Sequence, residues 1–541
     1  MATAANPHAT DAAMEMLRRG GHAVDAAIAA HAVLGLVEPQ SSGLGGGAFM
    51  LVYQHDTGTL LFHDGRETAP SGASVDMFMR DGEAMGFLDA WQSGLAVGVP
   101  GVIALYEDSH RKYGKLDWAE LFEPAIHLAT EGFVVSPRMA GFLPRLAQYT
   151  RLDENPGSAE YFYPGGKPLE AGHLLKNPEY ARTLTRVAEE GASAFYTGEI
   201  AEAIVQAVQQ APDPGTISLE DIANYETVER EAVCGPFRQL RICGSGPPSS
   251  ALTQIYMMSV YDHLLEESAD QADKIAAFVD AQRLAYADRD HYVADPDVVS
   301  VPVEAMLNPA YLEHRASQRF APGDAPAHGD PLGFAGVAQT QMPWGRDRTE
   351  EIAGTSHLSI IDGEGNAVSM TATVEAPFGS SRWVAGFLLN NEMTDFSREY
   401  HPDAAPQANA IAPGKRPRSS MSPVMLFDQQ GKLLLVSGSP GGNSIPAYVF
   451  KSLAAILDWG MTPAEAVAFP NIIARGKDVR VEVNLPSGQA IADDLKGRGY
   501  PVEEREGENS GLHLILVEED GLVGAADPRR EGTVGYLPPA P

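Results

Sequence analysis

The feature that most constrains this chain is a predicted β-hairpin that begins at Thr355. Two alternating runs, 356–361 and 367–374, flank a Gly-containing five-residue turn at 362–366. Alternating runs around such a turn are typical of a hairpin. The preceding segment, 339–350, is polar and has no apolar period. Thr355 is therefore predicted to open a strand directly after a linker.

The register of this hairpin predicts which side chains meet. If Ile361 pairs with Ala367, Thr355 lies directly opposite Thr373. Because strand side chains alternate with a period of two, Thr373 and Glu375 then share one face of the second strand.

A threonine that follows a glycine at a strand start suits one chemistry. Cleavage of the Gly354–Thr355 bond would make Thr355 N-terminal, and its own α-amine could then serve as the base for its hydroxyl. A threonine pair across two strands is also ordinary sheet stabilisation. The hairpin alone leaves both interpretations open.

Several segments spread along nearly the whole chain carry a resemblance to a known family. They are 43–49, 65–70, 247–250, 354–373, 389–396, 418–423 and 438–443. Each is weak alone, but their order and spacing together resemble the γ-glutamyltranspeptidase (glutathione hydrolase) family of N-terminal-nucleophile hydrolases. The resemblance implies an α+β fold, the four-layer αββα sandwich. It also implies self-cleavage into a large subunit, 1–354, and a small subunit, 355–541, which stay associated and share one core.

The resemblance implies a role for each catalytic residue. Thr355 supplies the nucleophile and, through its freed amine, the base. Thr373 orients the Thr355 hydroxyl. Gly441 and Gly442 offer two backbone N–H groups that can stabilise a tetrahedral oxyanion, although a Gly-Gly pair by itself reads as a plain turn.

Residues for a γ-glutamyl substrate follow from the same resemblance. A free α-carboxylate requires a forked cation and hydroxyl donors, and Arg66 and Ser419-Ser420 match these positions. The α-ammonium requires acceptors, and Glu392 and Asp395 match them. Local sequence alone would instead pair Arg66 with its neighbour Glu67.

One position departs from the family. Glu375 stands where well-known members carry an asparagine, which places three carboxylates, those of Glu375, Glu392 and Asp395, near one ammonium. These three carboxylates cannot all remain ionised unless nearby positive charge offsets their mutual repulsion. Either a cation such as Arg382 or Arg398 pairs with Glu375, or the pocket prefers a more cationic ligand.

Composition excludes several classes of function. The net charge is −33, from 72 acidic and 39 basic residues, which disfavours nucleic acids and anionic membranes as partners. The chain has no apolar run long enough to cross a membrane and no His/Cys spacing for a metal, so we expect a soluble protein without metal or cofactor. The sequence does not determine its compartment.

For Cys234 and Cys243 we expect two free, partly buried thiols, although one disulfide is possible.

The remaining pattern predicts stacked sheets flanked by helices. A glycine run at 43–47 precedes a strand and is predicted to form a tight buried turn rather than a phosphate loop. Expected helices are 8–19, 23–37, 103–113, 118–131, 180–190, 200–209, 252–266, 271–289, 445–458 and 462–468. Further expected strands are 48–53, 60–63, 385–390, 422–427, 432–437, 513–518 and 522–526.

We therefore expect an enzyme that cleaves γ-glutamyl amides such as glutathione through an ester on Thr355. A shortened lid at 396–419 favours water over an amine as the acyl acceptor. One alternative is a cephalosporin (glutaryl) acylase with the same nucleophile, which Glu375 supports. Another is a binding protein that never cleaves itself.

Overall fold

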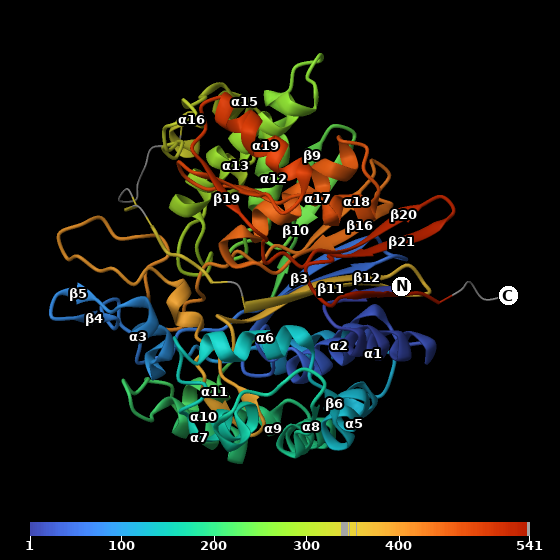
Figure 1. Ribbon diagram of the computed structural model, residues 1–541, viewed down its shortest axis with the longest axis vertical. Coiled ribbons are helices and arrows are strands. Elements are labelled where there is room, and N and C mark those ends of the chain that lie inside the picture. Colours follow the sequence, from blue (N-terminus) through green and yellow to red (C-terminus); the bar gives the residue numbers. More distant parts are fainter. Residues whose placement is uncertain (337–343, 346, 353, 538–541) are drawn as a thin grey trace.

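Two antiparallel sheets packed face to face form the centre of the protein (Figure 1). The computed structural model describes residues 1–336, 344–345, 347–352 and 354–537. Much of the expected polar linker, at 339–343 and 346, therefore lies outside the described residues. The first sheet has the order β22 (Thr533–Gly535), β1 (Ala2–Ala4), β11 (Gly354–Ile361), β12 (Ala367–Glu375), β2 (Gly47–Gln54), β3 (Thr59–Gly65) and β8 (Val228–Glu231). The second has the order β21 (Gly521–Ala526), β20 (His513–Glu518), β16 (Leu433–Gly438), β15 (Val424–Phe427), β10 (Leu240–Gly244) and β9 (Val233–Phe237).

Helices cover the outer face of each sheet and complete four layers, αββα (Figure 1). The expected sandwich is therefore confirmed. The helices on the side of the first sheet include α1 (Pro7–Arg18), α2 (Ala23–Val37), α4 (Val102–Tyr113), α5 (Glu123–Glu131), α8 (Pro178–Glu190) and α10 (Gly198–Val208). Those on the side of the second sheet include α12 (Ala251–Leu264), α13 (Gln271–Tyr292), α17 (Ile445–Leu457), α18 (Pro463–Ala468) and α19 (Pro486–Gly497).

Helix α2 shows why its sequence is apolar on every side. All of its residues are buried, since it packs against β11 and β12 on one side and against α4 and α5 on another. Because no face of this helix contacts solvent, its sequence shows no polar stripe. Its many alanines allow close packing between the sheet and the outer helices.

The glycine run before β2 is the predicted tight turn. A Cβ on Gly45 would lie 2.2 Å from the Leu388 carbonyl oxygen, and one on Gly46 would lie 2.0 Å from the Thr373 carbonyl oxygen. Only glycine permits these approaches. They bring β2 against β12 and against the segment that follows it.

The structure differs from the expected elements in several places, two of which lie near the site. In place of one strand at 385–390, two short strands, β13 (Trp383–Val384) and β14 (Phe387–Leu388), form a tight hairpin. Its turn residues have left-handed φ values, 46° at Ala385 and 92° at Gly386, which matches a two-residue hairpin turn. The approach to Thr355 also contains a helix, α15 (Pro309–Ser317), whose N-terminus is capped by the Asn308 side chain.

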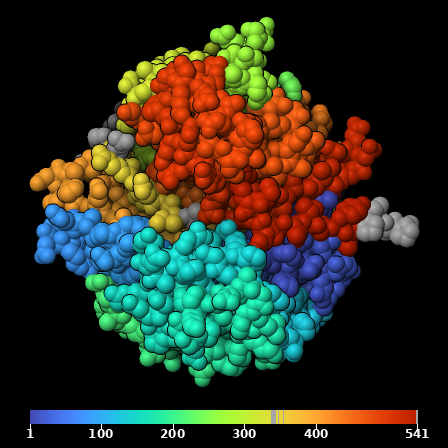
Figure 2. Space-filling view, in the orientation of Figure 1, coloured from blue at the N-terminus to red at the C-terminus, as the bar shows by residue number. Residues whose placement is uncertain are grey.

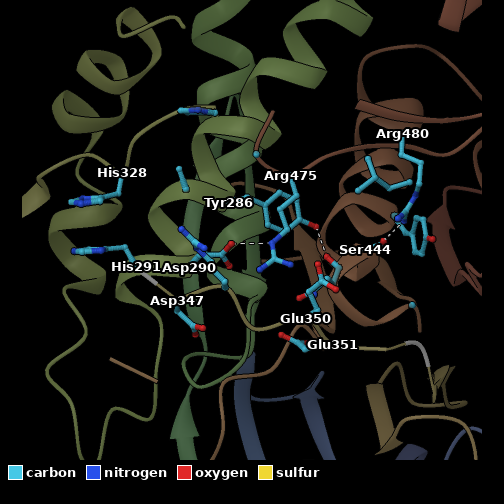
Figure 3. A pocket seen from close by; sticks show the side chains of 18 of the residues that line it. Tyr286, Asp290, His291, His328, Asp347, Glu350, Glu351, Ser444, Arg475 and Arg480 are labelled. Atoms are coloured by element: carbon cyan, nitrogen blue, oxygen red, sulfur yellow. Dashed lines mark hydrogen bonds and ion pairs between the residues drawn. The ribbon is translucent and has the colours of Figure 1, made fainter. Parts of the chain in front are cut away.

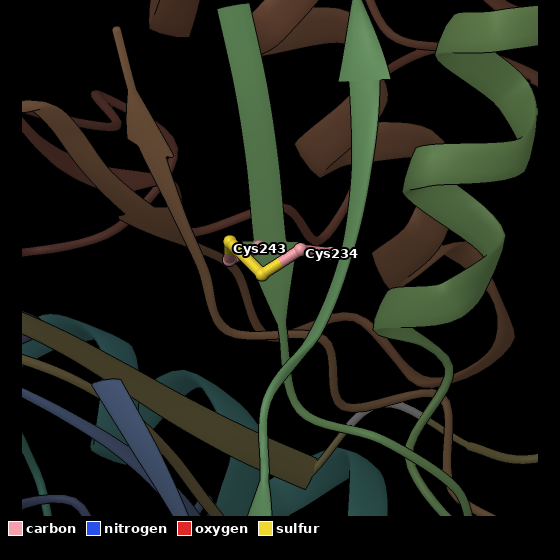
Figure 4. The surroundings of a disulfide bond; sticks show 2 residues. All are labelled: Cys234 and Cys243. Atoms are coloured by element: carbon pink, nitrogen blue, oxygen red, sulfur yellow. A yellow bond between two sulfur atoms is a disulfide. The ribbon is translucent and has the colours of Figure 1, made fainter. Parts of the chain in front are cut away.

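The expectation of two free thiols was wrong. Cys234 on β9 lies directly opposite Cys243 on β10, with their Cα atoms 4.1 Å apart, and the two form a disulfide (Figure 4). The pairing register of β9 and β10, which brings the two sulfur atoms together, could not be read from the sequence.

The first strand and the last described strand of the chain lie side by side. Strand β1 inserts between β11 and β22, and Figure 2 shows the N-terminal segment in blue beside the C-terminal segment in red. Within the described residues, none of the helices combines the length and apolarity needed to span a bilayer.

Candidate functional site

The predicted hairpin register is confirmed. Ile361 pairs with Ala367, and Thr355 lies opposite Thr373. On β11, Leu358 packs toward the helices of the first layer. Thr355 is three residues away, so it faces the opposite side, between the two sheets.

The hydroxyl of Thr373 links the nucleophile to the bond that would be cut. Its Oγ1 lies 3.1 Å from Thr355 Oγ1 and donates to the Gly354 carbonyl oxygen at 2.7 Å. It also accepts from the Glu375 N–H at 2.8 Å. Because the one Thr373 proton goes to Gly354, the Thr355 hydroxyl donates to Thr373. This arrangement polarises the Gly354 carbonyl beside the Thr355 oxygen.

A break in the ladder sets the position of Glu375. The register shifts between Gly354 and Thr355, so that Gly354 pairs with Glu375, and Glu375 has a left-handed φ of 73°. Bulges of this kind re-aim side chains near active sites. Here the Glu375 carboxyl accepts from the Ile352 N–H at 3.0 Å and from the Asn391 amide.

A small cavity of about 10 Å³ collects most of the predicted site. The predicted residues that line it are Arg66, Thr355, Thr373, Glu375, Glu392, Asp395, Ser419 and Gly442. Gly441 instead lines an adjoining cavity of about 870 Å³, whose walls include the pairs Arg475–Asp290 and Arg480–Ser444 (Figure 3). Ser420 reaches the small cavity through its contact with Glu351.

Arg66 is fully buried and already bonded. Its guanidinium donates to Glu392, to Asp395 at 2.6 Å and to the carbonyl oxygens of Pro417 and Arg418. Burial opposes its charge, but these carboxylates outweigh burial and raise the pKa of Arg66. The local pairing with Glu67 is present only at 3.9 Å.

The two arginines considered as partners of Glu375 make their hydrogen bonds elsewhere, although Arg398 lies near enough to feel the charge of Glu375. Arg382 and Arg398 donate to the carbonyl oxygens of Ala207 and Met85, and no salt bridge joins either of them to Glu375 in the described part of the chain. Burial, reinforced by the charge of Asp395, raises the pKa of Glu375 well above its ordinary value.

Other members of the acidic cluster behave in the same way. Burial also raises the pKa of Glu392 and Asp395, and it raises the pKa of Glu67 to about 7. Both Glu67 carboxyl oxygens, Glu392 Oε2 and Asp395 Oδ1 find no hydrogen-bond partner among the described residues. Unpartnered buried acceptors of this kind suit a cationic ligand.

Both predicted oxyanion glycines have conformations that favour glycine, with φ of 142° at Gly441 and 55° at Gly442. A Cβ on Gly441 would lie 2.3 Å from the Tyr448 ring, and one on Gly442 would lie 2.5 Å from the Glu351 carbonyl oxygen. A side chain at either position would clash with these neighbours, so glycine is required at both.

The prediction missed Glu351, which lies just before the cut. Its carboxylate accepts from the Ser420 N–H at 2.9 Å and from Arg289 Nη2 at 2.9 Å. Burial opposes its charge, but Arg289 and Arg418 outweigh burial and lower the pKa of Glu351. Only its place beside the predicted cleavage bond could have drawn attention to it.

The prediction also missed Arg530, which donates from Nη1 to the Thr355 carbonyl oxygen at 2.8 Å. The Thr355 carbonyl belongs to the peptide bond that follows Thr355, which cleavage at Gly354–Thr355 would not break. The contact therefore holds the start of β11 in place before and after cleavage. In the described residues, no group of three or more His, Cys, Asp or Glu side chains is arranged to hold a metal ion.

Comparisons with known proteins agree with this geometry. A family model described as gamma-glutamyltranspeptidase matches residues 9–537. The glutathione hydrolase proenzyme of Bacillus subtilis (strain 168) is 33% identical over 98% of this chain and 90% of its own length. The proenzyme of the same name from Escherichia coli (strain K12) is 34% identical over 99% and 92%. The crystal structure of cephalosporin acylase from Bacillus halodurans superposes with a TM-score of 0.86 at 26% identity, covering 100% of this chain and 96% of that one.

Proposed function

This chain belongs to the γ-glutamyltranspeptidase family, and from that premise we propose that it is a γ-glutamyl hydrolase that cleaves itself at Gly354–Thr355. The observation that carries the proposal is the Thr373 hydroxyl, bonded to Thr355 Oγ1 and to the Gly354 carbonyl oxygen. Attack of Thr355 Oγ1 on the Gly354 carbonyl carbon, followed by hydrolysis of the resulting ester, yields 1–354 and 355–541.

The freed amine of Thr355 then acts as the base. It takes the hydroxyl proton as Oγ1 attacks the γ-carbonyl of the substrate, and the oxyanion that forms is stabilised by the N–H groups of Gly441 and Gly442. The protonated amine gives its proton to the leaving nitrogen as the C–N bond breaks. Water, activated by the same amine, hydrolyses the γ-glutamyl ester on Thr355; an amine acceptor can take its place.

The acidic cluster suits the ammonium of a γ-glutamyl donor. Glu392 Oε2 and Asp395 Oδ1 are buried acceptors without partners among the described residues, and an α-ammonium supplies up to three donors. Glutathione and other γ-glutamyl compounds carry this group beside an α-carboxylate, which fits Ser419 and Ser420.

A glutaryl donor is the second candidate. The similarity to a cephalosporin acylase structure and Glu375 at the asparagine position both favour it. A glutaryl group lacks the ammonium, however, and would leave the unpartnered acceptors unsatisfied. We therefore rank the γ-glutamyl donor first.

Two measurements test the proposal. The purified wild-type protein should give two bands on a denaturing gel, whereas Thr355→Ala should give one band and no activity, and Thr355→Ser should retain part of both functions. Turnover of γ-glutamyl-p-nitroanilide should exceed that of glutaryl-p-nitroanilide. Two chains from Thr355→Ala would exclude Thr355 as the nucleophile, and a preference for the glutaryl anilide would select the acylase alternative.

A further inference from the structure

A third cavity, of about 870 Å³, lies between helix α6 (Pro137–Leu146) and the segment 505–531. In Figure 2 the cyan region that contains α6 borders the red C-terminal region. Among the described residues, six arginines and three glutamates line this cavity, although the whole chain has a net charge of −33. We call it the arginine cavity; its arginines are Arg138, Arg145, Arg480, Arg505, Arg529 and Arg530. Positive charge concentrated in one hollow of an acidic protein favours an anionic ligand there.

Three of these arginines are already neutralised by neighbouring carboxylates. Each has a guanidinium nitrogen within 2.6 Å of a carboxylate oxygen, in the pairs Arg480–Glu508, Arg505–Glu503 and Arg529–Glu482. Their charges are therefore offset by the protein itself.

The other three, Arg138, Arg145 and Arg530, have no close carboxylate. The salt bridge from Arg138 to Glu38 is long, at 3.9 Å, and in the described part of the chain no salt bridge joins Arg145 or Arg530 to an acidic side chain. Arg138 and Arg145 lie seven residues apart on α6, and their guanidinium groups pack over the same Phe142 ring, 5.1 and 5.3 Å from its centre. They therefore lie on one face of the helix.

Arg138 and Arg530 share a single neutral acceptor. Asn509 Oδ1 accepts from Arg138 Nη2 at 3.3 Å and from Arg530 Nη2 at 3.4 Å. The Nε atoms of both arginines are buried and find no hydrogen-bond partner among the described residues. Arg530 is only 7% exposed, and burial together with the charge of Arg138 lowers the pKa of Arg530 to about 9. Buried donors without an acceptor are destabilising, so a bound anion would stabilise this arrangement.

The nearby acids do not supply the missing charge. Burial raises the pKa of Glu38 although Arg138 and Arg530 oppose the rise, so its charge is disfavoured there. Glu531 Oε1 accepts from the backbone N–H of Arg138 at 2.9 Å rather than from a guanidinium, and Glu506 is exposed to solvent.

We propose that the arginine cavity binds a small anion with two or more carboxylate or phosphate groups, held by Arg138, Arg145 and Arg530. The planar forks of guanidinium groups match carboxylate and phosphate oxygens alike. This inference goes beyond the proposed function and does not depend on it. The ligand would also contact the guanidinium that holds the nucleophile strand, because Arg530 Nη1 donates to the Thr355 carbonyl oxygen.

Calorimetry on the uncleaved Thr355→Ala protein tests the site. In this form the small cavity beside Thr355, the donor cavity, has a volume of only about 10 Å³, so it cannot hold the probes. The probes are citrate and pyrophosphate, with acetate as the monovalent control, all at one ionic strength. We expect one molecule of citrate or pyrophosphate to bind per chain, and the better of the two identifies a polycarboxylate or a phosphate ligand. Binding of both no tighter than that of acetate would overturn the proposal.

Arg145→Gln in the same background locates the bound anion. Arg145 is exposed and donates to the Gly141 carbonyl of its own helix, so the variant should fold, and binding should weaken about 10- to 100-fold, the effect of one charge-assisted contact. The matched control is Arg182→Gln, on α8, which changes the net charge equally at an exposed side chain and should bind as the parent does. Equal effects of the two variants would show that only the overall charge matters and would overturn the proposal.

Arg475→Gln tests the adjoining cavity, which Arg475 lines. This variant should also bind as the parent does. A loss with Arg475→Gln and none with Arg145→Gln would place the anion in the adjoining cavity and overturn the proposal.

Kinetics of the processed enzyme separate this inference from the proposed function. Citrate should leave KM for γ-glutamyl-p-nitroanilide nearly unchanged, because the arginine cavity is not the donor cavity. A competitive rise in KM that persists in Arg145→Gln would place citrate in the donor cavity and overturn the proposal. A wild-type enzyme inactive on this anilide would overturn the proposed function, while calorimetry would still decide the arginine cavity.

Discussion

At the scale of single residues, Thr373 has the clearest role, because its one proton bonds the carbonyl of the bond to be cut. Thr373→Val keeps the shape and removes the donor, so we expect self-cleavage to slow about 100- to 1000-fold, the usual cost of one oxyanion donor. Thr373→Ser should cleave at a rate closer to wild type. Time courses on denaturing gels measure both, and maturation of Thr373→Val at the wild-type rate would show that this hydrogen bond is incidental.

Glu375 combines an unusual backbone with an unusual protonation state. Its φ of 73° is a conformation that asparagine adopts more readily than glutamate, and its raised pKa shows that its charge is disfavoured there. We expect Glu375→Asn to keep or increase kcat/KM for γ-glutamyl-p-nitroanilide and to shift the acid limb of the pH–rate profile. Glu375→Ala, which removes the acceptor as well, is the control. Near-complete loss of activity in Glu375→Asn with normal self-cleavage would identify the carboxyl itself as a required ammonium contact.

Glu67 gives a prediction about pH. Burial raises its pKa from 4.5 to about 7 in the folded state, so the folded protein binds the proton more tightly than the unfolded chain. The stabilisation is fully present below pH 4.5 and is lost as pH rises through 7. In the Thr355→Ala background, Glu67→Gln should therefore become more stable relative to its parent between pH 5 and 8, by about 1–3 kcal/mol. Thermal unfolding at several pH values measures this, and a pH-independent difference would contradict it.

At the scale of elements, the hairpin β9–β10 carries the disulfide at the edge of the second sheet. The bond closes a loop with a sequence separation of 9, which corresponds to about 2–3 kcal/mol of stability. The double variant Cys234→Ser/Cys243→Ser should lose about that much in chemical unfolding, while its kcat/KM stays near wild type because neither cysteine lines the donor cavity. A loss of kcat/KM in a folded double variant would contradict this prediction, because it would show that the β9–β10 edge affects catalysis.

The same disulfide bears on where the protein matures. Disulfides persist mainly in oxidising compartments, so we propose a periplasmic or secreted location. Protein isolated without reductant from its native host should show no free thiol by alkylation, and two reactive thiols in the native protein would contradict the proposed compartment.

At the scale of the whole molecule, the proposed self-cleavage would cut one bond within a shared core. Strand β1 of 1–354 lies between β11 and β22 of 355–541, and β12 pairs with β2. The two products cannot separate without breaking both sheets. We expect one peak at the full-length mass in size-exclusion chromatography and one cooperative thermal transition, although a denaturing gel shows two bands. Elution of two separate native species would refute a common core.

The amino-acid sequence predicted the features that depend on neighbouring residues. It predicted α2, the buried turn before β2 and the hairpin register that places Thr355 opposite Thr373, because periodicity and turn length act locally. The resemblance to the family identified most of the residues that line the small cavity beside Thr355. The pairing of the charges depends on the complete fold, since Arg66 meets Glu392 across 326 positions of sequence. The fold likewise brings Glu351 to Arg289 and Cys234 to Cys243, and it buries Glu375 so that the pKa of its carboxyl rises. Burial and long-range contact set these properties, and neither can be read from local pattern.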